Sequence, residues 1–310
     1  MRSRLLHLQE KIQDTNALIS QMERTLRTSE APPSVIATIR SLESRRQLLE
    51  QDFLALAERK SLDVCSYRMF NRGEHFKLSG FASALADFQT TVSLTYDALK
   101  NGPKQRARLT PEVEAATSFD FGYAFSGSVG VVLTLENERL LLGETLLDET
   151  MAVVFEMAKA ETSSEIATFA KKIGPPPIRA LYQWASDHVA ADMGADIEWR
   201  KDRSVRGALL VQQPELYRLR EAIAATSDQT VETITVTGRL IGIDTSTKRF
   251  RLELPNGEEI AGSSGDVVNE GHSVVVPSQQ TARIEVKTKV HYSIDKEEKS
   301  WRLLSLSEGA

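Results

Sequence analysis

The first 56 residues carry two runs of apolar positions at the alternating three- and four-residue spacing of helices that pack along one seam. The first run is Leu5, Leu8, Ile12, Thr15, Ile19, Met22 and Leu26, and the second is Val35, Ile39, Leu42, Arg46, Leu49, Phe53 and Leu56. Between the runs, Pro32 and Pro33 interrupt helical structure, and Ser34 stands where an N-cap belongs. The pattern predicts two helices, each roughly 40 Å long.

A chain that folds back at residues 29–34 forms an antiparallel coiled-coil hairpin over residues 1–60. The numbers of the opposed seam positions then sum to 61 in every pair, from 5 with 56 to 26 with 35. Thr15, the polar seam position of the first helix, falls opposite Arg46, the charged seam position of the second. This coincidence favours a Thr15–Arg46 polar layer, with Asp14 or a nearby polar group receiving the guanidinium.

Four leucines lie beside the main seam, namely Leu6, Leu18, Leu48 and Leu54. One hairpin cannot bury a second apolar surface on itself, so either the body of the protein or a second copy covers these leucines. Because coiled coils often associate, we expect a homo-oligomer formed through residues 1–60.

Residues 61–226 mix helical and strand periodicities and predict an α+β domain with a mostly antiparallel sheet. Helices are expected over residues 81–99, 144–160, 164–172, 178–193 and 214–225. Strands are expected over residues 115–121, 130–135, 196–200 and 205–212. Residues 226–230 are expected to be a polar linker to the next domain.

Beyond the linker the helical period disappears, and residues 231–310 predict a small β-barrel of OB-like or SH3-like type. Ile284, Val286 and Val290 alternate with charged residues and should point inward, whereas Arg283, Glu285, Lys287 and Lys289 should point outward. Pro255-Asn256-Gly257 is typical of a hairpin turn. The predicted fold is therefore multidomain α+β, with boundaries at 1–60, 61–226 and 231–310.

Composition limits the possible functions. The formal net charge of −5 provides no general field that would attract nucleic acid or an anionic membrane. The single cysteine, Cys65, excludes an intramolecular disulfide and a cysteine-rich zinc site. We expect a cytoplasmic protein without a membrane partner, since the N-terminus lacks the apolar core of a secretory signal and no apolar run reaches about 20 residues.

The spacing of the residues does not favour a metal site or a phosphate-binding loop. No two of the five histidines share a spacing suited to chelation. Gly127 and Gly130 precede a strand rather than a helix, so they are interpreted as turn residues and not as a phosphate loop. Glu285 and Lys287, with Asp266 upstream, have the residue types of a metal-dependent nuclease, but they alternate with apolar residues as on the outer face of a strand. We expect no cofactor and no metal.

Arg68 and His75 are separated by six residues, which resembles the Arg-x4–6-His pattern of HEPN-type ribonucleases. In that family the pair acts on the scissile phosphate and the 2′-hydroxyl, so the resemblance implies RNA cleavage by these two residues. The segment departs from the pattern at Met69, where a polar residue is usual, and at Gly73, which weakens the required helix. We interpret Arg68–His75 as a turn that enters the α+β body.

Two groups of cations are candidate nucleic-acid contacts. Lys100, Lys104, Arg106 and Arg108 form a basic loop, and Arg249 and Arg251 occupy outward positions of the predicted barrel. Residues 231–310 nevertheless contain ten Lys and Arg against twelve Asp and Glu, which leaves no positive field over the barrel. They also lack the set of aromatic residues on which bases stack.

The patterns thus describe an architecture more than an activity. We expect a non-enzymatic interaction or assembly protein that oligomerises through its hairpin and holds a protein partner with its body or its barrel. The alternative is a nucleic-acid-directed effector subunit, in its enzymatic form a HEPN-like ribonuclease.

Overall fold

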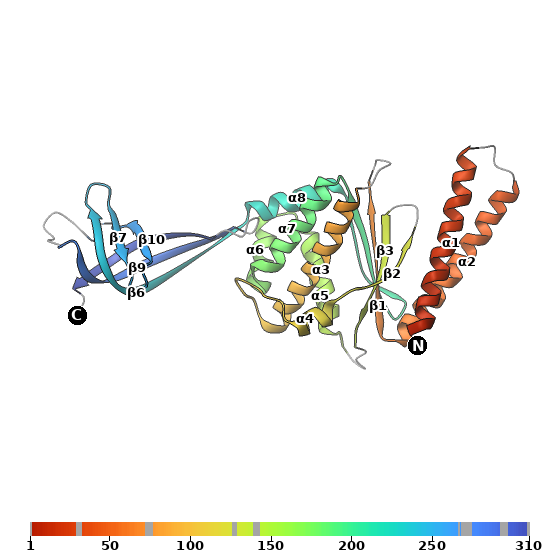
Figure 1. Cartoon of the computed structure of the whole chain (residues 1–310), viewed down its shortest axis with the longest axis horizontal. Helices are drawn as coiled ribbons and strands as arrows, with labels where there is room; N and C mark the ends of the chain where they lie inside the picture. Colours follow the sequence, from red (N-terminus) through yellow and green to blue (C-terminus); the bar gives the residue numbers. More distant parts are fainter. Residues whose placement is uncertain are drawn as a thin grey trace. The chain divides into compact units, whose positions relative to one another are not determined.

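The computed structural model describes residues 2–28, 33–71, 77–125, 129–138, 143–265, 267, 275–291 and 297–308. The chain divides into two compact units, residues 1–226 and 227–310. The described residues form an α+β protein with one sheet in each unit (Figure 1).

The first unit begins with two long helices, α1 (Arg2–Thr28) and α2 (Pro33–Arg59), which lie side by side (Figure 1). Ile12, Ile19 and Phe53 are buried, as their seam positions require. α2 begins at Pro33, so the prediction of Ser34 as the N-cap is wrong: Ser34 lies in the first turn of the helix, whose first residue is a proline, as proline's fixed φ allows. We use the term helix pair for α1 and α2, because their assignment as a coiled coil remains a prediction.

A five-stranded sheet follows the helix pair, in the order β2-β3-β1-β4-β5. Its strands are β1 (Leu62–Phe70), β2 (Asp120–Phe125), β3 (Val129–Glu136), β4 (Gly194–Lys201) and β5 (Ser204–Val211). Every neighbouring pair is antiparallel, which agrees with the predicted sheet type. The central strand, β1, has no counterpart among the predicted strands.

The described residues of this unit also form the helices α3 (Leu78–Asn101), α4 (Pro111–Thr117), α5 (Leu146–Ala158), α6 (Ser163–Ile173), α7 (Pro175–Ala190) and α8 (Gln213–Ala225). The predicted strand over residues 115–121 is wrong in its first half, where α4 ends. Thr110 caps that helix and Pro111 occupies its first turn, two local signals that override the apolar run. Strand structure begins only at Asp120.

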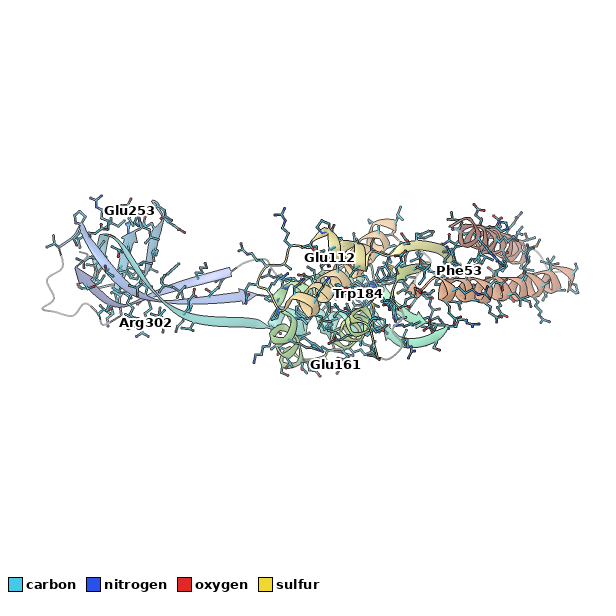
Figure 2. All side chains as sticks on the ribbon, turned by 90° about the horizontal axis from the view of Figure 1, so that it is seen from below. Phe53, Glu112, Glu161, Trp184, Glu253 and Arg302 are labelled. Atoms are coloured by element: carbon cyan, nitrogen blue, oxygen red, sulfur yellow. The ribbon has the colours of Figure 1, made fainter. Side chains whose placement is uncertain are left out.

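The sheet lies between two helical layers. Helices including α3, α5 and α7 cover one face, and the helix pair packs on the other (Figure 1). Trp184 lies within the first layer, whereas Phe53 lies where the helix pair meets the sheet (Figure 2). There the ring of Phe53 contacts Tyr123 edge-on, with ring centroids 5.3 Å apart, and Ile12 and Val64 join the same cluster. Of the four leucines beside the seam, Leu54 packs against this cluster, whereas Leu6, Leu18 and Leu48 are exposed.

The second unit contains β6 (Ser227–Asp244), β7 (Arg249–Glu253), β8 (Glu259–Ser263), β9 (Ser278–His291) and β10 (Glu297–Glu308). Antiparallel pairing joins β8 to β7, β7 to β6, β6 to β9 and β9 to β10. The sheet closes on itself where β10 pairs with β8 in parallel, through one residue pair, Arg302 with Ser263. A single closing residue pair does not identify the sheet as an OB-like or SH3-like barrel, so that barrel type stays a prediction.

The inward alternation predicted for β9 agrees with the burial of Ile284 and Val286, while Arg283 is exposed. The side chains of Val290 and Lys289 lie outside the described residues. The expected linker over residues 226–230 is wrong, because β6 already begins at Ser227.

Candidate functional site

Of the Arg68–His75 pair, the structure describes only the arginine. Arg68 lies on β1 rather than on a helix or in a turn, and its guanidinium pairs with Asp196 of β4, with Nη2 and Oδ2 2.5 Å apart. Residues 68–70, the described start of the motif, are extended and belong to β1, which is paired with β3 and β4. His75 lies outside the described residues. Arg68 therefore acts in this structure as a cross-strand ion-pair partner.

The predicted polar layer of the helix pair consists of two residues with separate partners. The buried hydroxyl of Thr15 donates to the carbonyl of Lys11, one turn earlier, at 2.7 Å. Arg46 pairs within its own helix, where Nε lies 3.7 Å from Oε1 of Glu50. Glu50, and not Asp14, thus receives the guanidinium. Among the described residues no hydrogen bond or ion pair joins Thr15 to Arg46, and their opposition stays a prediction.

A polar crevice of about 360 Å³ separates α2 from the sheet beside this layer. Its lining includes Glu50 and Gln51 from α2 and Glu198 and Arg200 from β4. Burial raises the pKa of Glu50, and the nearby Arg46 partly offsets that effect. The sheet face beneath the helix pair is consequently not a purely apolar interface. The docking is fixed in part by polar contacts, such as the amide of Asn16 donating to the carbonyl of Ala124 at 3.1 Å.

Several of the candidate nucleic-acid contacts already have acidic partners. Lys100 pairs with Glu112 at 2.6 Å, Lys104 binds the buried carboxylate of Asp97 at 2.7 Å, and Arg251 lies 3.5 Å from Glu259. The remaining three, Arg106, Arg108 and Arg249, are exposed. Lys100 and Lys104 are thus held in local ion pairs, and nucleic-acid contact by the six cations stays a prediction.

A polar network at one end of the sheet was not found by sequence reasoning. Its members are Asp63 of β1, Asn137 after β3, Thr145 and Asp148 at the start of α5, and Lys201 of β4. Asn137 donates to Asp63 at 2.6 Å and to Asp148 at 3.2 Å, while Lys201 binds Asp148 at 2.5 Å. Burial alone would raise the pKa of Asp148, but hydrogen bonds from Lys201 and Thr145 outweigh it and hold that pKa below its usual value. The network ties β1, β3, β4 and α5 together.

A second buried network lies between the sheet and α7. Trp184 donates through Nε1 to the hydroxyl of Tyr67 at 2.7 Å, and that oxygen lies 2.8 Å from Nε2 of His188. Nδ1 of His188 lies 3.3 Å from the carbonyl of Met193, which can only accept, so Nδ1 carries the proton and Nε2 accepts from Tyr67. Burial lowers the pKa of His188 to about 4, so the ring is neutral at pH 7. All three side chains are buried, which makes this network part of the core.

The candidate functional site is an outer groove of about 660 Å³ between the start of α1 and strand β2. Leu5, Leu6, Leu62 and Phe121 provide its apolar lining. Leu6 is 54% exposed and Phe121 is 56% exposed, which is unusual for such large apolar side chains that share one concave surface. This groove is a candidate protein-binding surface rather than a catalytic centre.

Charges of both signs border the groove. Arg59 and Lys60 lie at the end of α2, whereas Asp120 and Glu136 belong to β2 and β3. The sequence contained one signal for this surface, the position of Leu6 beside the main seam. Phe121 was expected within a strand, but nothing in the sequence showed that it would face outward beside Leu6.

In the described part of the chain, no group of three or more His, Cys, Asp or Glu side chains could hold a metal ion. Over the same residues, no helix is both long enough and apolar enough to cross a membrane. Comparisons with models of protein families, with curated proteins and with solved structures find no match for this chain.

Proposed function

We propose that this protein is a non-enzymatic assembly protein that associates with itself through the surface formed by its helix pair. The observation that carries the proposal is the outer groove, where Leu6 and Phe121 are exposed together beside the start of α1. Removing these two side chains from water upon association would be favourable, at about 25 cal/mol for each Å² of apolar surface buried.

The charges around the groove support a second copy as the partner. A two-fold axis brings the same surface of both copies together in opposite directions. The cations Arg59 and Lys60 of one copy would then approach the anions Asp120 and Glu136 of the other. Such a surface is complementary to itself, which favours a closed dimer over an open filament.

The further parts of the proposal concern the remaining surfaces. The second unit is proposed to be an OB-like or SH3-like barrel that, with the body, holds a protein partner. Its net charge of −2 over residues 231–310 supports a protein rather than a nucleic acid as that partner. A cytoplasmic location belongs to the same proposal, because Cys65 is the only cysteine and is buried.

The test is the molar mass of the protein by size-exclusion chromatography with light scattering. We expect the unmodified protein to have a multiple of the single-chain mass and the double variant Leu6→Ser, Phe121→Ser to have the single-chain mass. Leu210→Ser is the matched control, since Leu210 is also exposed, at 62%, but lies on β5 away from the groove. A single-chain mass for the unmodified protein would reject self-association, and an oligomer that survives the double variant would reject the groove as its interface.

Point variants are preferred to removal of residues 1–60. That deletion should also lower the assembly state, but it would expose Val64, Tyr123 and Val132, which now pack against the helix pair. A newly exposed apolar sheet face can aggregate for reasons unrelated to the native interface.

A further inference from the structure

Strand β5 forms the edge of the five-stranded sheet that lies opposite to β2. It pairs with β4 on one side, regularly over residues 207–211, and no described strand pairs with its other side. Ala208 shows that backbone groups face outward there, because its carbonyl accepts from Nζ of Lys159 at 3.2 Å. The alternation of an antiparallel ladder places the N–H and C=O of Leu210 on the same outer side. β5 therefore offers backbone hydrogen-bonding groups to a further extended chain.

At the opposite edge, the matching backbone group is covered by a helix. The carbonyl of Ala124 on β2 accepts from the side-chain amide of Asn16 of α1 at 3.1 Å. On β5 the exposed side chain of Lys159 takes this place, and Leu210 beside it is 62% exposed. A lysine over an edge strand discourages pairing with other chains but does not seal the edge. Among the described residues, β5 is thus the sheet edge that remains accessible.

A cavity of about 410 Å³ lies beside this edge, on the face of the sheet that α5 covers. Met151 and Phe155 of α5 give it an apolar wall, and residues 205–207 of β5 also line it. Gly207 pairs with Trp199, which lines the same cavity. Because directly opposed residues of a sheet point to the same face, a side chain of an added strand opposite Gly207 points to the cavity side.

Two cations flank this stretch of β5. Lys159 follows the end of α5, and Arg206 is an exposed residue of the cavity lining. Among the described residues, neither cation forms an ion pair. Of the acidic residues that line the cavity, Asp148 is ion-paired and Asp202 has an interaction of its own, which leaves Glu144 against the two cations. The excess of positive charge favours an acidic partner.

We propose that β5 binds an extended acidic segment of a partner protein as an additional antiparallel strand. The backbone of this segment bonds to the N–H and C=O of Ala208 and Leu210 and displaces Lys159, which then pairs with a carboxylate of the segment. An apolar side chain opposite Gly207 enters the cavity, and a second carboxylate pairs with Arg206. The backbone bonds provide affinity, whereas the cavity and the two cations provide selectivity.

This inference rests on the part of the proposed function that gives the body a protein partner. It is independent of the proposed self-association, because the outer groove lies at the opposite edge of the sheet, on β2. A failure of one proposal is therefore distinguishable from a failure of the other: peptide binding tests the β5 edge, and the molar mass of the protein alone tests the groove.

The ligand for the test is the fluorescein-labelled peptide Val-Glu-Val-Phe-Glu, and the readout is its fluorescence anisotropy with the full-length protein. In the antiparallel register the second valine pairs with Ala208 and the phenylalanine lies opposite Gly207. N-methylation of that valine removes an N–H that points at β5 and should weaken binding at least about tenfold. N-methylation of the phenylalanine removes an N–H that points away and should change the affinity less than about threefold. Replacing both glutamates by lysine should weaken binding at least about tenfold.

Lys159→Gln and Arg206→Gln should each weaken binding of the peptide about fivefold, as expected for the loss of one exposed ion pair. Lys171→Gln, which removes an exposed cation of α6, is the matched control and should leave the affinity unchanged. Because all three positions are exposed, the variants should fold. The proposal is wrong if the peptide does not bind, if the two N-methylated peptides bind alike, or if both Gln variants at the edge bind with unchanged affinity. A second copy of the chain is the other possible occupant of this edge. Bound peptide would then lower the molar mass in light scattering, and that result would also overturn the proposal.

Discussion

The buried His188 should make the first unit sensitive to acid. Its pKa is lowered to about 4 by burial, against an ordinary value of 6.5 in the unfolded chain. Between these two values the unfolded chain binds a proton that the folded protein does not. The free energy of unfolding therefore falls as the pH is lowered through this window, and the full contribution is present only above pH 6.5.

The size of the effect follows from the pKa difference. Over the whole window it amounts to about 3 kcal/mol, and between pH 7 and pH 5 to about 2 kcal/mol. Asp87 acts in the opposite direction, because burial and its hydrogen bond with Asp187 raise its pKa to about 6. A simple pH profile of the protein would combine the two effects, so the contribution of His188 has to be separated by a variant.

His188→Gln is the appropriate variant, since glutamine can retain a hydrogen bond with Tyr67 but does not titrate. At pH 7 the variant should be less stable, because it loses the fit of the imidazole between Tyr67 and Met193. On lowering the pH to 5, the difference in unfolding free energy between the two proteins should shrink by about 2 kcal/mol. Asp87 is present in both proteins and cancels in this comparison.

The assay is urea unfolding at pH 7 and pH 5, followed by tryptophan fluorescence in a Trp301→Phe background. That background leaves Trp184 and Trp199 as reporters, and both belong to the first unit. A stability difference that stays constant between the two pH values would refute the reasoning. It would mean that His188 titrates alike in the folded and unfolded states.

Three other variants test separate parts of the structure. Asp87→Asn should raise the thermal midpoint relative to the unmodified protein at pH 7 but not at pH 4, because the raised pKa of Asp87 lowers stability only where this carboxyl is ionised in the unfolded chain. An equal effect on the midpoint at both pH values would contradict this. Lys201→Met should lower the unfolding free energy by about 3 kcal/mol, because it leaves Asp148 buried without its cation. A loss below about 1 kcal/mol in urea unfolding would mean that the Lys201–Asp148 ion pair does not stabilise the first unit. Gly262→Ala should destabilise the second unit by at least about 2 kcal/mol, since its Cβ atom would lie 2.2 Å from the carbonyl oxygen of Trp301. Gly242→Ala is the control and should be tolerated, because no atom lies nearer than 3.9 Å to its Cβ position. Equal destabilisation of the two variants, measured by urea unfolding and Trp301 fluorescence, would argue against the contact between β8 and β10.

The sequence predicts the peripheral elements of the fold better than its centre. Helices α5 and α6 have both an apolar face and a capping box, at Thr145 and Thr162, so local signals and tertiary packing agree. Strand β1 lies at the centre of the sheet with helices on both faces, and its side chains are buried or half-buried at nearly every position. Such a strand has no alternation of apolar and polar residues to reveal it.

The functional surfaces were harder to predict, because they depend on contacts between distant residues. Asp63 and Asn137 are 74 residues apart, and Asp148 and Lys201 are 53 residues apart. A single sequence shows only the local part of that network, the Thr145–Asp148 capping box. Likewise, Arg68 has the correct spacing to His75 for a catalytic motif, but spacing does not reveal that β4 places Asp196 beside it.

The order of elements in the first unit has a consequence for synthesis on the ribosome. The helix pair is made first, yet the sheet on which it packs needs β3, β4 and β5, which end at Val211. At 5–20 residues per second, the interval between Arg59 and Val211 is on the order of 10 s. During that time Ile12 and Phe53 have no sheet to cover them, so the nascent chain exposes an apolar helical surface to chaperones and to neighbouring nascent copies. Helix pairs on adjacent ribosomes of one messenger RNA could therefore meet before either chain has folded.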